Sequence, residues 1–253
     1  MRKIEVNKDI QRFKEALMDS QRIVFFGGAG VSTESGIPDF RSADGIFMEE
    51  TGYQFSPEEV ISNSFYKKYP EIFFEFYFDK LVYPEAEPTI GHTWLKELED
   101  IGKDVSIVTQ NIDGLHQKAG SHKVYELHGT TLDNYCETCG QHYTNDALHL
   151  DEQGIPRCPK DGGIVRPNVV LYEEGLNQAT IGQAVDAIRQ ADMLIIAGTS
   201  LVVYPAAGLV QYFGAEHLVI VNKTPLKTQH PHAIHFEDSI LNVFQAIDPR
   251  ELR

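Results

Sequence analysis

The sequence predicts an α/β protein built on a Rossmann-like, doubly wound parallel sheet with a small inserted domain. Short apolar runs alternate with helical patterns along most of the chain, as they do when helices cover both faces of a parallel sheet. Glycine or polar residues directly follow several of these runs. Because ligands of such sheets bind at the carboxyl ends of the strands, we expect these residues to meet on one rim.

The elements of the sheet follow in a regular order. The chain opens with an amphipathic helix at 8–19, in which Ile10, Phe13 and Leu17 share one face. An apolar strand at 22–26 comes next and is closed by glycines. Beyond it, the pattern predicts helices at 91–100, 177–190, 204–212 and 238–247, and strands at 105–109, 193–197 and 217–221.

Residues 57–83 form a separate block. Pro57-Glu58-Glu59 is a typical helix start, and aromatic residues are dense after it. These side chains form either the core of a small helical module or the wall of an apolar channel. They are Phe65, Tyr66, Phe73, Phe74, Phe76, Tyr77 and Phe78.

The chain of 253 residues is long enough for one good core plus an insertion. We expect the Rossmann-like domain to comprise 1–40, 86–131 and 166–253. Two insertions are expected to form the small domain, a helical one at 41–85 and a zinc-ribbon-like one at 132–165.

The composition excludes several classes of protein. The hydrophobic share of 42% is ordinary for a globular protein. No apolar run is long enough to span a bilayer, and the first five residues carry no apolar signal region. We therefore expect a cytoplasmic protein without a membrane partner. Its three cysteines cannot complete a disulfide framework, which favours a metal-binding or structural role.

The chain is strongly acidic. Its formal net charge is −15, from 22 basic and 37 acidic residues. This balance argues against nucleic acid as a partner, because phosphate binding needs a basic footprint. It suits a cationic partner such as a lysine-rich peptide, and it equally serves to keep a protein in solution.

The cysteines have the spacing of a metal site. Cys136 and Cys139 form a C-x2-C pair, and Cys158 follows after 18 intervening residues. A structural zinc ribbon would place a fourth cysteine at position 161, where this chain has Asp161. A carboxylate oxygen also ligates zinc but holds it more weakly than a thiolate. We expect these four residues to bind zinc. The alternatives are His142 or His149 as the fourth ligand, and a metal-free site held by packing.

The segment 28–41, GAGVSTESGIPDFR, follows the first strand. Small residues after a strand let backbone N–H groups approach a phosphate. The segment resembles the cofactor-binding loop of the sirtuins, the NAD-dependent protein-lysine deacylases. Four further segments resemble the same family in the same order and with matching spacing, and the details are most similar to its compact bacterial members. They are 109–116, 126–129, 198–205 and 219–223.

The resemblance implies an enzyme that acts on acylated lysine peptides or proteins, with acetyl-lysine as the expected substrate and nicotinamide and 2′-O-acyl-ADP-ribose as products. The alternatives within the enzyme class are removal of succinyl-type groups and ADP-ribosyl transfer to protein. The contrasting class is a non-catalytic module that senses NAD or ADP-ribose, and the presence of His128, Asn111 and Asp113 argues against it. The oligomeric state is left open, and a monomer is compatible with the sequence.

His128, in the context Leu-His-Gly, matches the family's general base, a role that suits a group titrating near neutral pH. Asn111 and Asp113 alternate along an extended segment, so their side chains face the same way. They resemble the pair that holds the nicotinamide ribose and carboxamide, although both also suit a turn before Gly114. The remaining positions that match NAD contacts are Gly28, Ala29, Gly30, Ser32, Thr33, Asp39, Phe40, Arg41, Gln110, Ile112, Gly198, Thr199, Ser200, Asn222, Lys223 and Ile240.

Residues 165–176 match the family's substrate strand, on which an acyl-lysine peptide pairs by its backbone. The family has Phe-Gly-Glu where this chain has Tyr-Glu-Glu at 172–174, which leaves the local turn and the substrate preference open. The peptide contacts expected here are Val169, Val170, Leu171 and Tyr172.

Tyr77 and Lys80 occupy the Y-x-x-R position that marks sirtuins preferring dicarboxylic acyl groups. Lysine replaces arginine, so a carboxylate would meet a point charge rather than a bidentate fork. Both residues otherwise suit an ordinary helix face. We expect acetyl-lysine to be the better substrate, with succinyl-lysine second.

Overall fold

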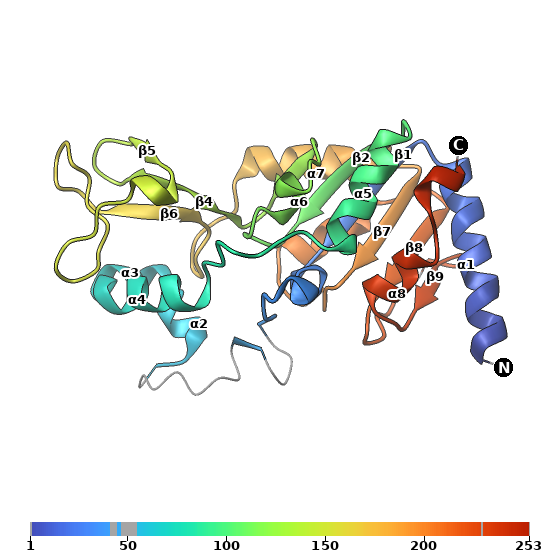
Figure 1. Ribbon diagram of the computed structural model, residues 1–253, viewed down its shortest axis with the longest axis horizontal. Coiled ribbons are helices and arrows are strands. Elements are labelled where there is room, and N and C mark those ends of the chain that lie inside the picture. The colour runs from blue at the N-terminus through green and yellow to red at the C-terminus, as the bar shows by residue number, and fades with distance from the viewer. Residues whose placement is uncertain (1, 41–44, 47–54, 229, 253) are drawn as a thin grey trace.

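The computed structural model describes residues 2–40, 45–46, 55–228 and 230–252. Its centre is a six-stranded parallel sheet with the order β3-β2-β1-β7-β8-β9 (Figure 1). The chain builds outward in both directions from β1 and β7, which confirms the Rossmann-like fold. The strands are β1 (Arg22–Gly27), β2 (Asp104–Thr109), β3 (Val124–Glu126), β7 (Met193–Ala197), β8 (His217–Val221) and β9 (Ile234–Phe236).

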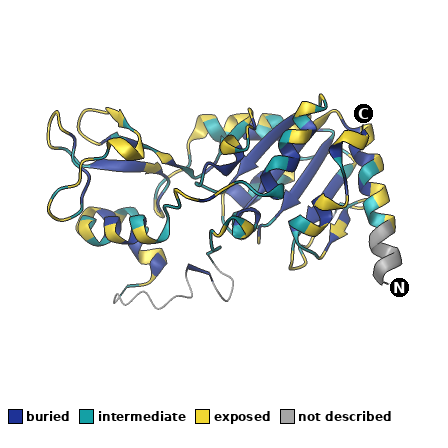
Figure 2. Ribbon diagram, viewed as in Figure 1, coloured by how far each residue is buried: buried dark blue, intermediate teal, exposed yellow. Residues whose placement is uncertain are grey.

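The strands contribute to two apolar layers, one on each face of the sheet. In β1, Ile23 and Phe25 face one layer while Val24 and Phe26 face the other, and none of the four is more than 2% exposed. Figure 2 shows that the strands of this sheet are mostly buried, whereas the helices around them are partly exposed. Burial on both faces explains why the strands are unbroken apolar runs. The first face is covered by α1 (Arg2–Asp19), α5 (Ile90–Asp100) and α8 (Ile240–Gln245), and the second by α7 (Gln178–Gln190) and the 3₁₀ helix η5 (Ala206–Tyr212).

Side chains satisfy the first N–H groups of several helices. At the start of α7 the side-chain oxygen Oδ1 of Asn177 accepts the N–H groups of Ala179 and Thr180. At the start of α8 the Ser239 hydroxyl accepts the Asn242 N–H. Such caps fix where the helices begin. Shorter elements of the large lobe are α6 (Leu115–Lys118) and the 3₁₀ turns η1 (Ala29–Val31), η2 (Thr33–Ser35) and η6 (Pro249–Leu252).

A second lobe lies beside the parallel sheet (Figure 1). It holds an antiparallel sheet of β4 (Gly129–Cys136), β5 (His142–Tyr143) and β6 (Val165–Val169), in the order β5-β4-β6. The helices α2 (Pro57–Val60), α3 (Asn63–Lys68) and α4 (Pro70–Lys80) and the 3₁₀ turn η4 (Asn145–Ala147) complete the lobe. Most of the aromatic side chains expected in the 57–83 block are buried here, in clusters that include Ile155, Val169 and Leu171.

The structure differs from the expected elements in several places. The first helix begins at Arg2, six residues before its expected start. The 204–212 segment is a 3₁₀ helix that begins at Ala206, and the short strand β9 was not expected. Strands β4 and β6 each cross an expected domain limit, at 131 and at 165, because they pair with each other; the division of the chain at those limits stays a prediction. No helix in the described part of the chain is both long and apolar enough to cross a membrane.

Candidate active site

A cavity of about 650 Å³ lies between the parallel sheet and the second lobe. It is lined by the loops that follow β1, β2, β3, β7 and β8, which we call the rim, and by the 170–174 loop that follows β6. The strand order reverses between β1 and β7, the place where doubly wound sheets bind their ligands. The volume lies within the range of roughly 300–1,000 Å³ typical of cofactor and substrate pockets.

Glycines let the loops after β1 and β7 touch. Gly30 donates its N–H to the Gly198 carbonyl at 2.9 Å, and a Cβ at position 30 would lie 2.8 Å from the Gly198 Cα. Gly198 has φ +59°, and a Cβ there would lie 2.6 Å from the Val31 nitrogen. A Cβ on Gly28 would lie 2.8 Å from that of Thr199. Side chains are excluded at these contacts, so bare backbone faces the cavity.

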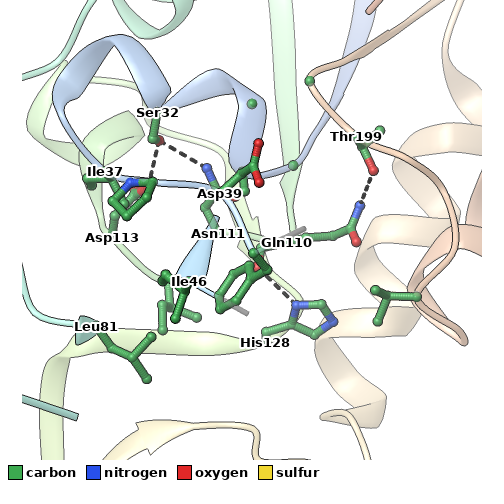
Figure 3. A pocket seen from close by; sticks show the side chains of 18 of the residues that line it. Ser32, Ile37, Asp39, Ile46, Leu81, Gln110, Asn111, Asp113, His128 and Thr199 are labelled. Atoms are coloured by element: carbon green, nitrogen blue, oxygen red, sulfur yellow. Dashed lines mark hydrogen bonds between the residues drawn. The ribbon is translucent and has the colours of Figure 1, made fainter. Parts of the chain in front are cut away.

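Ser32 is the centre of a hydrogen-bond network in the cavity wall (Figure 3). Its hydroxyl donates to Asp113 Oδ2 at 2.7 Å and accepts from Asn111 Nδ2 at 3.0 Å. His92, which is fully buried on α5, lies 3.4 Å away through Nε2. Its Nδ1 accepts the Thr89 N–H at 3.2 Å, so the ring proton is on Nε2. The side chains of Asn111 and Asp113 therefore meet at one hydroxyl, as their alternation predicts.

His128 lies on the turn between β3 and β4. Its Nδ1 is 2.9 Å from the Gln110 carbonyl oxygen, so Nδ1 carries the proton and Nε2 keeps its lone pair (Figure 3). Burial lowers the pKa of His128, and the bond to Gln110 offsets part of that effect, so the ring is neutral at pH 7. The next residue, Gly129, has φ +77°, and a Cβ there would lie 2.0 Å from the Asn168 carbonyl oxygen. Only glycine allows β4 to leave this turn against β6.

The Gln110 side chain connects the loops after β2 and β7. Its Nε2 donates to Thr199 Oγ1 at 3.1 Å, and the same oxygen accepts the Leu201 N–H at 3.2 Å. One glutamine therefore contributes twice, through its backbone to His128 and through its side chain to Thr199.

The cavity brings together the residues expected to contact NAD. Arg41 lies outside the described residues, and the roles of the others stay predictions. Those that line the cavity are Gly28, Ala29, Gly30, Ser32, Thr33, Asp39, Phe40, Gln110, Asn111, Ile112, Asp113, His128, Gly198, Thr199, Ser200, Asn222, Lys223 and Ile240.

The residues expected to contact the acylated peptide divide into two groups. Val169, Val170, Leu171, Tyr172 and Lys80 line the cavity. The tyrosine at position 77 is not among the lining residues, because it lies in the aromatic core of the second lobe and is 1% exposed, and its role stays a prediction. Its ring is stacked 6.0 Å from that of the phenylalanine at 73, and burial raises the pKa of its hydroxyl.

The match to a family model decides the family. A model described as the Sir2 family matches residues 28–205, more than half of the chain. The chain belongs to the Sir2 family. The resemblance to sirtuins in the sequence is thereby confirmed.

Relatives and solved structures agree with this assignment. A protein named NAD-dependent protein deacetylase from Clostridium perfringens is 54% identical over 91% of this chain and 95% of its own length. A structure described as Sir2 with a p53 peptide and NAD+ matches with a TM-score of 0.80 at 33% identity, over 93% of this chain and 95% of that one. Another, described as Sir2 bound to acetylated peptide, has a TM-score of 0.81 at 33% identity and the same coverage.

The cysteine cluster of this Sir2-family chain has the geometry of a zinc site. Ligand atoms of Cys136, Cys139, Cys158 and Asp161 all lie within 4.8 Å of one another. The sulfurs of Cys139 and Cys158 are 3.8 Å apart, and that of Cys136 is 3.4 Å from Asp161 Oδ1. A tetrahedral ion with metal–sulfur bonds of about 2.3 Å sets its sulfurs about 3.8 Å apart. The donor set therefore fits a structural zinc ion.

The histidines proposed as alternative ligands lie outside this cluster. His142 Nδ1 is 2.8 Å from Asp133 Oδ1 instead, and His149 is exposed. None of the four clustered residues lines the cavity, so a zinc ion there would hold the second lobe rather than take part in chemistry.

Proposed function

We propose that this Sir2-family chain is an NAD-dependent protein-lysine deacetylase. The observation that carries the proposal is a histidine whose Nδ1 is bonded to a backbone carbonyl, which leaves Nε2 for the chemistry, in the same cavity as a glycine-lined phosphate cradle and the Asn111–Ser32–Asp113 network. The named activity of its relative at 54% identity supports it. When bound, NAD supplies the glycosidic bond whose cleavage releases nicotinamide and the ribose that receives the acyl group.

His128 is the general base of this proposal. Nε2 accepts a proton from a hydroxyl group in the cavity, while Nδ1 stays bonded to the Gln110 carbonyl and keeps the ring in one orientation. A base must be unprotonated to act, and the lowered pKa of His128 keeps it so at pH 7. A module that only sensed NAD would have no need of such a group.

The Ser32 network positions the nicotinamide half of the cofactor. Asp113 Oδ1 accepts the Leu115 N–H at 2.9 Å while Oδ2 accepts the Ser32 hydroxyl, so both oxygens are fixed before any ligand binds. Asn111 is fixed through the same hydroxyl. Carbonyl and carboxylate oxygens held this way can accept hydrogen bonds from ribose hydroxyls and from a carboxamide. Preformed acceptors lower the ordering cost of binding.

The acylated peptide is proposed to pair with the 170–174 loop through backbone groups, and its acyl group to enter the cavity toward Lys80. We favour acetyl over succinyl. The Lys80 amino group is 3.4 Å from the Asp79 carboxylate, and the tyrosine at position 77 is 1% exposed and is not among the residues that line the cavity. A strongly hydrated lysine beside a carboxylate gives weak selection for an acid.

The test is product analysis on one peptide carrying acetyl or succinyl lysine. With NAD, the acetyl peptide should lose its acyl group and nicotinamide should appear in equal amount, and neither should occur without NAD. A peptide that gains ADP-ribose instead would favour the transferase alternative. Absence of NAD-dependent loss of any acyl group would contradict the proposal.

A further inference from the structure

Glu173, in the 170–174 loop, has an unusual backbone conformation. Its φ of +74° is in the left-handed region, and among the described residues Leu201 is the only other non-glycine residue there. An L-residue with a long side chain adopts this region at a cost in free energy. The sirtuins that the sequence resembles have glycine at this position, and glycine adopts this region at little cost. Glutamate does not, so contacts of its side chain must offset the cost.

The contacts that hold Glu173 come from the start of α3, more than a hundred residues earlier. Its Oε2 accepts the Ser64 N–H at 2.8 Å and its Oε1 accepts the Ser64 hydroxyl at 2.9 Å. The neighbouring Tyr172 pairs with the same segment, since its N–H donates to the Ile61 carbonyl at 3.1 Å and its carbonyl accepts the Asn63 N–H at 3.0 Å. The side-chain bonds thus extend a backbone pairing between the loop and the helical part of the second lobe.

The next residue anchors the loop on its opposite side. Glu174 bonds the buried Arg166 of β6 at 2.7 and 3.1 Å, and its Oε2 also accepts the Leu171 N–H at 2.9 Å. The Val170 N–H donates to the His128 carbonyl at 2.8 Å. Two adjacent carboxylates therefore bond to different elements, Glu173 to α3 and Glu174 to β6. The backbone between them is fixed at the cavity edge.

We propose that Glu173 is a positioning residue for the acylated peptide, and that its bonds to Ser64, the Glu173–Ser64 clamp, hold the 170–174 loop in the shape that the peptide pairs with. This inference rests on the proposed deacetylase function. A loop ordered in advance binds an extended peptide without the cost of ordering it at that moment. The clamp bonds neither His128 nor the Ser32 network directly, and the Val170 bond to the His128 carbonyl does not depend on the Glu173 carboxylate. We therefore expect its loss to act on peptide binding and to leave the chemical step and NAD binding unchanged.

The experiment measures kcat and KM for an acetylated peptide, and KM for NAD, in Glu173→Ala, Ser64→Ala, their double variant and Ser64→Thr. Glu173→Ala keeps the Cβ that disfavours this backbone conformation and loses the carboxylate that holds it, so KM for the peptide should rise roughly three- to tenfold, the cost of hydrogen bonds to one charged group. The kcat and the KM for NAD should stay at wild-type values. The double variant should be no worse than Glu173→Ala, because both changes break one clamp. Ser64→Thr keeps a hydroxyl and should restore the wild-type KM.

Glu75→Ala is the matched control, since Glu75 is an exposed glutamate on α4. It should leave all constants unchanged. If Glu173→Ala destabilises the fold, Ser64→Ala serves as the test instead, and its KM for the acetylated peptide should rise. Wild-type KM for the peptide in both single variants would overturn the clamp while leaving the deacetylase function intact. Absence of NAD-dependent turnover in the wild type would instead overturn the function and the clamp with it.

Discussion

The rim of the parallel sheet and the cysteine module at 132–165 hold their shapes by different means. The strands behind the rim separate two large apolar clusters that include side chains from α1, α5, α7 and α8. The buried cluster of the module consists of Cys136, Cys158 and Val165, with two partly buried neighbours. Packing fixes the rim, whereas the module would depend on a zinc ion held by its four ligand atoms. Changes at the rim should therefore alter chemistry without loss of stability, and changes in the module should do the reverse.

The largest effect is expected from His128→Ala at the rim. Deacetylation should fall by about 10²–10⁴-fold, because that is the usual contribution of a general base. His128 is only half-buried on a turn, so the melting temperature should change little. The measurements are turnover of an acetylated peptide and thermal unfolding. Near-native turnover would remove His128 from the role of base, and a large loss of stability would break the contrast between the two regions.

In the module, Cys136→Ala should lower stability and leave the rim intact. Losing one of four ligands should release the zinc, and each kcal/mol lost lowers the melting temperature of a chain this size by about 2–4 °C. Proteolysis should begin within 132–165. A chelator should lower the wild-type melting temperature to a similar extent and have no further effect on the variant. Elemental analysis that finds no zinc in freshly purified wild-type protein would contradict this prediction.

A smaller effect is expected from pH, through a histidine buried behind the rim. His116 is 1% exposed, and neither ring nitrogen has a hydrogen-bond partner within the described residues. Burial, together with neighbouring His92, lowers its pKa well below the usual value. Below about pH 6.5 the unfolded chain therefore binds a proton that the folded chain does not, and the free energy of unfolding falls by up to about 1.4 kcal/mol per pH unit.

The matched pair for this prediction is His116→Leu and the exposed His232→Gln. Denaturant unfolding between pH 7 and 5 should show a shallower pH dependence in His116→Leu and a wild-type dependence in His232→Gln. Equal slopes in all three proteins would show that His116 does not carry the effect.

The smallest effect is expected from Lys80→Ala. Because the lysine charge lies beside Asp79 near the surface, kcat/KM for an acetyl peptide should stay within about threefold of wild type. The wild type should prefer acetyl to succinyl. A wild-type preference for succinyl that collapses in the variant would contradict our assignment of the acyl group and make Lys80 a specificity residue of the rim.

The same contrast explains what the sequence predicted well. Strands β7 and β8 were predicted at their observed limits, because buried parallel strands are continuous apolar runs between polar residues. The rim followed from topology, since loops after parallel strands must meet at one edge. Strand β9 was missed because it has three residues, of which the central His235 is exposed.

Contacts between distant segments could not be predicted. Position 173 bonds Ser64 across 109 residues, and no local pattern marks either one. His92 lies among the apolar positions of α5 and reads there as a core residue, although it supports the Ser32 network. The tyrosine at 77 shows a further limit of sequence patterns. The Y-x-x-R position it shares with Lys80 does not reveal that aromatic rings surround and bury its side chain, so its role in the acyl pocket stays a prediction.

The proposed reaction at the rim is transfer of the acetyl group of lysine to ADP-ribose, with His128 as the base. The most direct test uses a peptide whose lysine carries a ¹³C-labelled acetyl group, with NAD and the wild-type protein, and follows the label by mass spectrometry. We expect the label to appear on ADP-ribose, in the same amount as the nicotinamide released, and His128→Ala to abolish this product. Label recovered as free acetate from the first turnover, with NAD intact, would contradict it.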